Sequence, residues 1–113
     1  MTLKQWLEID TRFLSAYRCA LALITILIRA NGFRILRDQH HYRTIEALRF
    51  VLPETESAYR VFLQQCRKKR NELSYCTVGV ATENDLKELL NMITIIRKAV
   101  SDTLSSNFPE LVP

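Results

Sequence analysis

Glycine and proline are scarce in this chain, which has 2 Gly and 3 Pro among 113 residues. An all-β domain needs many tight turns, and these two residues are the commonest means of making them. Because Gly32 and Gly79 are the only glycines, the chain also contains neither a P-loop nor the Gly-rich turn of a dinucleotide-binding site. The scarcity of both residues favours long helices joined by short connections.

Cysteine and histidine do not form a metal-binding pattern. The three cysteines Cys19, Cys66 and Cys76 show no pairing pattern, and neither Cys-x-x-Cys nor His-x-x-x-His spacing occurs. His40 and His41 are adjacent, so they cannot both face one ion from a regular helix or strand. We therefore expect no metal and no cofactor, and the unpaired cysteines suggest a reducing, cytoplasmic location.

The longest apolar run, from Cys19 to Ile28, is short for a membrane span. It has ten residues, closed by Arg18 and Arg29, whereas a spanning helix needs about 20. The run also lies too far inside the chain to resemble a signal peptide. Because it is apolar on nearly every face, it predicts a helix buried at the centre of a bundle, or one buried by both its own domain and a partner.

The apolar periodicity predicts an all-α, up-and-down four-helix bundle with a short additional N-terminal helix. A length of 113 residues, with 48% hydrophobic and 25% charged residues, fits one folded domain. We expect this domain to span residues 1–107, with 108–113 as a C-terminal tail. The short first helix begins at a capping box, Thr2-x-x-Gln5, and the second helix is capped by Asp10 or Thr11 and stops at Asn31-Gly32, with Phe33 as the following apolar contact. The third helix runs from Tyr42 to Leu52 and is ended by Pro53, and the fourth runs to about Tyr75. The last helix begins at the capping box Thr82-x-x-Asp85 and runs to about Leu104.

The middle of the chain is basic. Residues 29–70 contain ten Arg or Lys and four Asp or Glu, a net charge of +6, whereas the whole chain carries +4. An arginine-rich segment of this kind suits a polyanionic partner, because the guanidinium offers a planar fork to phosphate. A solvated face with local ion pairs explains the same composition, so both interpretations stay open here.

One arginine lies on the apolar stripe of the fourth helix. The stripe contains Tyr59, Leu63 and Cys66, and helical spacing continues it to Arg70 and Leu73. Burial of a guanidinium without a partner costs several kcal/mol. Arg70 is therefore expected to meet a carboxylate, a second subunit or a bound anion.

The run from Cys66 to Tyr75 resembles the motif of the HEPN (higher eukaryotes and prokaryotes nucleotide-binding) superfamily. Many HEPN proteins are metal-independent ribonucleases whose motif is Arg, four to six residues, then His, often with Asn next to the Arg. Arg70 and Asn71 match the Arg-Asn pair, and Tyr75 stands where the His belongs. Some HEPN branches carry this Arg-Asn-x-x-x-Tyr version. The resemblance covers roughly residues 13–104.

The resemblance implies a helical homodimer that binds RNA or a nucleotide at a basic cleft between its subunits. It also implies a metal-independent endoribonuclease activity, and a minimal nucleotidyltransferase as a partner in a toxin–antitoxin pair. The motif and the basic segment together indicate the candidate catalytic and binding residues. We assign the catalytic role to Arg70, Asn71 and Tyr75, and nucleic-acid binding to Arg67, Lys68, Lys69, Arg34, Arg37 and His41.

A non-catalytic helical interaction module is the alternative. In that case Arg70 is structural and pairs with Asp85 or Glu88 of the last helix. Whichever function holds, we expect His40 and His41 to be loop residues near the start of the third helix. Chemistry gives some support to this alternative, because a tyrosine with a pKa near 10 is only about 0.1% ionised at pH 7 and is a poor base.

Overall fold

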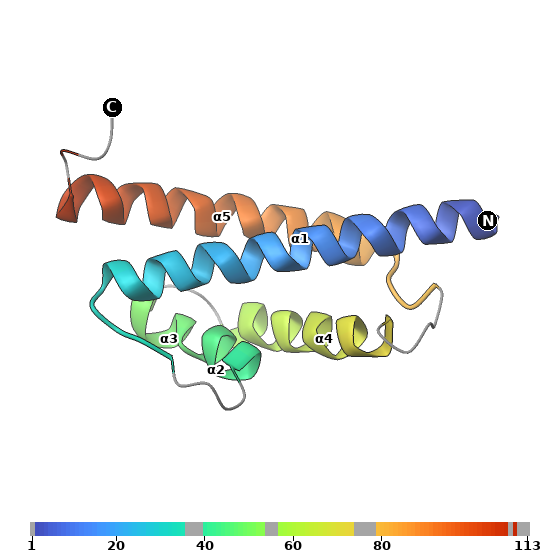
Figure 1. Cartoon of the computed structure of the whole chain (residues 1–113), viewed down its shortest axis with the longest axis horizontal. Coiled ribbons are helices and arrows are strands. Elements are labelled where there is room, and N and C mark those ends of the chain that lie inside the picture. Colours follow the sequence, from blue (N-terminus) through green and yellow to red (C-terminus); the bar gives the residue numbers. More distant parts are fainter. Residues whose placement is uncertain (1, 36–39, 54–56, 74–78, 109, 111–113) are drawn as a thin grey trace.

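A computed structural model describes residues 2–35, 40–53, 57–73, 79–108 and 110. Within these ranges the chain forms helices and no strands, so the predicted all-α bundle is confirmed. Figure 1 shows the arrangement of the helices. They are α1 (Leu3–Ala30), α2 (His40–Glu46), α3 (Leu48–Val51), α4 (Ser57–Leu73) and α5 (Glu83–Asn107).

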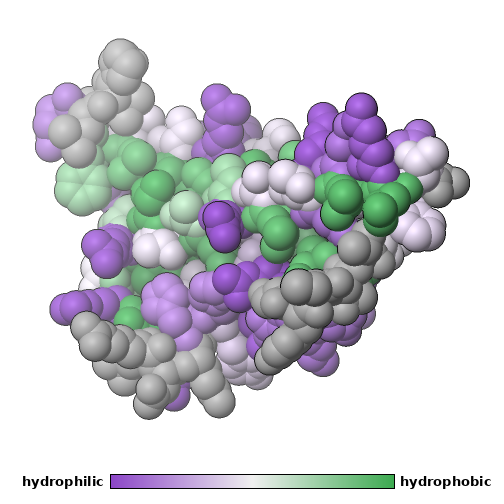
Figure 2. Space-filling model, turned by 45° about the vertical axis from the view of Figure 1, so that its right-hand side comes forward, coloured by the Kyte–Doolittle hydropathy of each residue, from purple (hydrophilic) through white to green (hydrophobic). Residues whose placement is uncertain are grey.

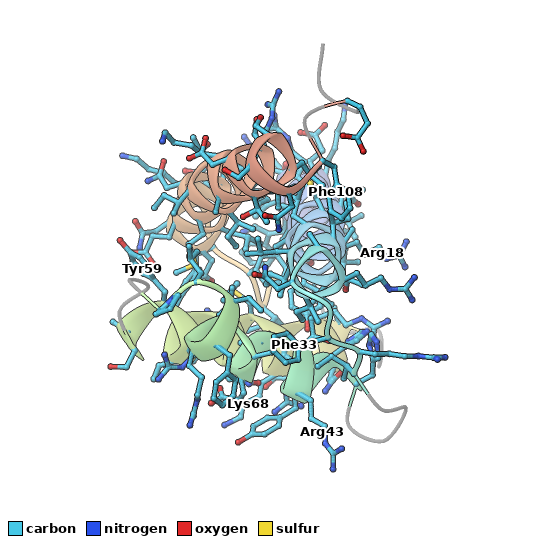
Figure 3. All side chains as sticks on the ribbon, turned by 90° about the vertical axis from the view of Figure 1, so that its left-hand side faces the viewer. Arg18, Phe33, Arg43, Tyr59, Lys68 and Phe108 are labelled. Atoms are coloured by element: carbon cyan, nitrogen blue, oxygen red, sulfur yellow. The ribbon has the colours of Figure 1, made fainter. Side chains whose placement is uncertain are left out.

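The two longest helices, α1 and α5, lie side by side and run in the same direction (Figure 1). Asn107 Nδ2 donates to the carbonyl oxygen of Ala30 at 3.3 Å, and near the other end the amide of Gly79 donates to Asp10 Oδ2 at 3.0 Å. Helix α4 runs the opposite way and shares a second layer with α2 and α3, as the view along the bundle shows (Figure 3). The three long helices therefore alternate in direction along the chain, with α1 and α5 parallel to each other and antiparallel to α4 (Figure 1).

Three of the predicted helix ends, at Thr2, at Asn31-Gly32 and at Thr82, are confirmed. Thr2 and Thr82 each accept a hydrogen bond from the third helical residue, Gln5 or Asp85, whose side chain bonds back to the cap. Gly32 ends α1 with φ +83°, a conformation that glycine adopts without steric cost. The amide of Phe33 then donates to the carbonyl of Ile28 at 3.1 Å, as in a Schellman motif.

The prediction of a short additional N-terminal helix was wrong, because α1 is continuous from Leu3 to Ala30. Asp10 and Thr11, whose side chains could cap a helix, form other hydrogen bonds here. Thr11 Oγ1 donates back to the carbonyl of Leu7 at 2.8 Å, which a threonine inside a helix can do. Asp10 reaches out to Gly79 instead of capping its own chain. No break is therefore needed at Asp10 or Thr11.

The predicted third helix is divided into α2 and α3 by the single residue Ala47. Its backbone is still near the helical region, with φ −66° and ψ −15°, and its amide donates to the carbonyl of Arg43 at 2.9 Å. The division is therefore slight. His40 and His41 form the first turn of α2, so the expectation that they belong to a loop was wrong.

The core forms where α1 meets α5 on one side and the layer of α2 to α4 on the other. Phe13, Ile24 and Leu89 have no exposed surface. On α4, Leu63 and Cys66 are buried, whereas Leu90 of α5 is about half exposed. Helix α1 buries one apolar stripe, and its buried residues are Ile9, Asp10, Phe13, Ala16, Tyr17, Ala20, Ile24, Leu27 and Ile28.

Helix α1 is long and apolar enough to span a membrane, judged by length and composition alone. Its most apolar 18-residue window has a mean hydropathy of 1.6, and 39% of that window is buried within the molecule. The core helix of a soluble protein passes the same test. Leu3, Trp6 and Leu7 are exposed near its N-terminal end, and Figure 2 shows apolar side chains on this surface interrupted by hydrophilic ones.

Replacing Thr82 with alanine is expected to destabilise the protein by about 1 kcal/mol, because the first turn of α5 loses its cap. Urea unfolding measures this loss. Thr94→Ala is the matched control, since the Thr94 hydroxyl only donates back to the carbonyl of Leu90 inside the same helix. Alanine is a better helix former, so the control should lose nothing. Equal losses in both variants would show that the cap contributes nothing.

Candidate functional site

A cavity of about 610 Å³ opens between the start of α2 and the second half of α4. Arg67 and Asn71 lie four residues apart on α4, so their side chains share one face of the helix. The short helix α2 brings the two histidines to the same place. The residues that line the cavity are His40, His41, Tyr42, Arg67 and Asn71.

The imidazole of His41 is favoured in its neutral form. Burial lowers the pKa of His41 below its ordinary value of 6.5. The nearby charges of Arg70, His40 and Arg67 lower the pKa further, because a protonated His41 ring would add another positive charge close to theirs. At pH 7 the ring is therefore mostly neutral and can accept a proton.

Tyr17 of α1 supports the histidine from the core side. Its ring meets the His41 ring edge-on, with a centroid separation of 6.0 Å. The side chain is 1% exposed, and its hydroxyl has no hydrogen-bond partner among the described residues. Burial raises the pKa of Tyr17 to about 12, although Arg67 and Arg70 oppose the shift. Tyr17 therefore keeps its proton and fixes the position of His41 by packing.

A network of polar side chains holds Arg67 in the cavity wall. Its Nε donates to Gln64 Oε1 at 2.8 Å, and its guanidinium lies 5.6 Å from the centroid of the Tyr42 ring. Gln64 in turn donates to the carbonyl of Tyr42 at 3.1 Å and to Glu46 Oε2 at 3.0 Å. These contacts tie α4 to α2, so the guanidinium is oriented before any ligand arrives.

Arg70 is half-buried on α4, and its charge reaches both His41 and Tyr17. The Arg70 side chain also has an interaction partner in the structure. Of the two carboxylates that we considered as its partners, Asp85 and Glu88, the first is engaged elsewhere, because Asp85 Oδ2 lies 2.5 Å from Lys69 Nζ. Among the described residues, this Lys69–Asp85 pair provides the ion pair that joins α4 to α5.

The remaining predicted residues are divided among several surfaces. Lys68 is exposed and lines a smaller cavity of about 260 Å³ on the outer side of α4. Figure 3 shows Lys68 on the side of the molecule away from α5. Arg34 lines a separate groove beside α2. Tyr75 and Arg37 lie outside the described residues, so the predictions for these two residues stay predictions.

The structure adds His41 to Asn71 and Arg67 as a possible participant in chemistry, whereas the sequence nominated it only for binding. The motif gave no indication of this, because His41 precedes Arg70 by 29 positions and only the packing of α2 on α4 brings His41 near the charge of Arg70. Cys66 is a buried core residue. This burial raises the pKa of its thiol to about 12. Among the described residues, no group of three His, Cys, Asp or Glu could hold a metal ion.

Comparisons with protein-family models, with curated proteins and with solved structures found no match to this chain.

Proposed function

We propose that the cavity between α2 and α4 binds the phosphate groups of RNA, and that the chain is a HEPN-like, metal-independent endoribonuclease of low activity. The observation that carries this proposal is the convergence of His41, Arg67 and Asn71 on one cavity. A neutral imidazole can act as the base in phosphodiester cleavage by the 2′-hydroxyl, a guanidinium can stabilise negative charge on the phosphate, and an amide can orient the hydroxyl.

The reaction assigns one role to each group. His41 takes the proton of the 2′-hydroxyl, whose oxygen attacks phosphorus and forms the new O2′–P bond. The P–O5′ bond breaks, and the leaving oxygen takes up a proton from a general acid or from water. Products are a 2′,3′-cyclic phosphate and a 5′-hydroxyl. Arg67, with the charge of Arg70 nearby, stabilises the negative charge on the phosphoryl oxygens, and Asn71 orients the hydroxyl.

The cytoplasmic location, the homodimer and the minimal nucleotidyltransferase partner belong to the same proposal. The homodimer and the nucleotidyltransferase rest on the resemblance of Arg70, Asn71 and Tyr75 to the HEPN motif, and the location rests on the three cysteines without a pairing pattern. The exposed outer face of α4, with Val61, Lys68 and Glu72, leaves a surface on which a second subunit could complete the cleft.

Replacing Arg67 with alanine is expected to weaken RNA binding and to reduce its salt dependence, because one phosphate contact is lost. For single-stranded RNA the slope of log K against log salt should become shallower by about 0.7. Fluorescence anisotropy over a salt series measures this slope. Arg18→Ala is the control: it removes an equal charge from the exposed face of α1, where Figure 3 shows Arg18 pointing away from the bundle.

The result that would contradict the proposal is RNA binding that responds equally to the loss of Arg67 and of Arg18, or that is insensitive to salt. The basic middle of the chain would then be a solvated face. The non-catalytic interaction module would replace the proposed function.

A further inference from the structure

A second cavity, a groove of about 630 Å³, lies beside the first one. It runs between the end of α1 and the outer side of α2 and α3. Apolar side chains form much of its wall, namely Ile28, Phe33, Ile35, Phe50 and Val51. The proposed cleavage chemistry uses none of these residues.

Aromatic rings in this groove face solvent to an unusual degree. Phe50 is 72% exposed and Phe33 is 59% exposed, and Tyr42 is 43% exposed. Large aromatic side chains are among the residues that folding buries most readily, so a cluster of exposed rings indicates a binding surface. Figure 3 shows Phe33 on the same side of the bundle as Arg43, which projects into solvent from α2.

The rim of the groove is positively charged. Arg34, Arg43 and Arg49 line it and are all exposed. The one carboxylate of the lining, Glu46, is already engaged. Its Oε1 lies 3.0 Å from Arg49 Nη2, and its Oε2 accepts from Gln64 at 3.0 Å. The occupant that complements this rim is therefore an anion with flat apolar parts.

Tyr42 joins the two cavities. Its side chain lines both, with the guanidinium of Arg67 over its ring. A chain whose phosphate lies beside His41 and Arg67 would therefore pass Tyr42 and enter the groove between Phe33 and Phe50. Proteins that bind single-stranded nucleic acid combine stacking rings with a basic groove in this way.

We propose that this groove stacks the unpaired bases of an RNA strand, so that the substrate is single-stranded RNA. The inference rests on the proposed function, which it deepens by naming the substrate class. A paired base is unavailable for stacking on a side chain, whereas every unpaired base offers a flat face. A second copy of this chain is the weaker candidate. A symmetric contact through this face would bring Arg34, Arg43 and Arg49 close to their own copies, and like charges across an interface repel.

The test measures fluorescence anisotropy of the full-length protein with three probes, a short oligouridylate, a strand of equal length with abasic sugars, and a duplex RNA of equal length. Phe33→Ala and Phe50→Leu each remove one flat ring, and leucine keeps apolar bulk at position 50. Each is expected to weaken binding of oligouridylate by about tenfold and to leave binding of the abasic strand unchanged. Wild type should bind oligouridylate more tightly than the abasic strand or the duplex.

Phe108→Ala is the matched control, since Phe108 is also solvent-exposed and follows α5, remote from Phe33 in Figure 3. It should change no affinity. If both groove variants bind oligouridylate as wild type does while Arg67→Ala weakens it, base stacking is wrong and phosphate binding stands. If Arg67→Ala also has no effect, both proposals fall. Light scattering that shows the groove variants dissociating a dimer, with RNA affinity unchanged, assigns the groove to a contact between copies and overturns the inference.

Discussion

Replacing His41 with alanine is expected to lower metal-independent RNA cleavage by about 10²–10⁴-fold, the usual contribution of general acid–base catalysis. His41 lines the cavity with Arg67 and Asn71, and burial together with nearby positive charge lowers its pKa. The wild-type ring is therefore already neutral at pH 7 and able to take the proton of the 2′-hydroxyl. Cleavage of a single-stranded RNA in EDTA, followed on a gel, measures the rate.

The dependence on pH provides a second readout. A base must be deprotonated to act, so the wild-type rate should be level near pH 7 and fall as the pH drops through the pKa of His41, which lies below 6.5. Arg67→Ala should lower the rate without moving this fall far, because burial is the largest cause of the shift. Arg18→Ala, on the exposed face of α1, should leave both the rate and the profile unchanged. Full activity of His41→Ala in EDTA would remove His41 from the mechanism.

Local rules predicted much of the fold because they act over a few residues. The capping boxes at Thr2 and Thr82, and the stop at Gly32, each depend on side chains within one turn of the helix end. The stripe on α1 followed from helical spacing, since one face must be buried to form a core. Sequence alone therefore located α5 and the C-terminal end of α1.

Tertiary contacts decided what the local rules could not. Asp10 has the right chemistry for a cap, but its carboxylate is used by the amide of Gly79, 69 positions away. Lys69 pairs with Asp85, and spacing along α4 cannot indicate which of two neighbouring cations forms this pair. His41 enters the site because α2 packs on α4. In each case the decisive partner comes from a distant segment of the sequence.

The motif itself requires a different test, because Tyr75 lies outside the described residues. Its proposed role is argued from the sequence, in which it lies four residues after Asn71, where the HEPN motif that this segment resembles has its histidine. If His41 supplies the base, the missing participant is an acid that protonates the leaving oxygen. A tyrosine hydroxyl with an ordinary pKa near 10 releases its proton reluctantly at pH 7, whereas an imidazolium releases it readily. This difference accounts for the low activity proposed for the native chain.

Replacing Tyr75 with histidine is therefore expected to raise cleavage in EDTA by up to about 10²–10⁴-fold. The pH profile should change in a specific way. Native cleavage should have no falling limb near neutrality, because tyrosine stays protonated, whereas the Tyr75→His variant should lose activity as the pH rises above about 6.5. Tyr75→Phe should abolish the native activity, and Arg70→Ala should abolish the activity of both the native and the Tyr75→His forms. A folded Tyr75→His variant that binds RNA normally and yet cleaves no faster would show that position 75 does not donate the proton. The cavity would then be a binding site, and the chain an interaction module that holds single-stranded RNA without cutting it.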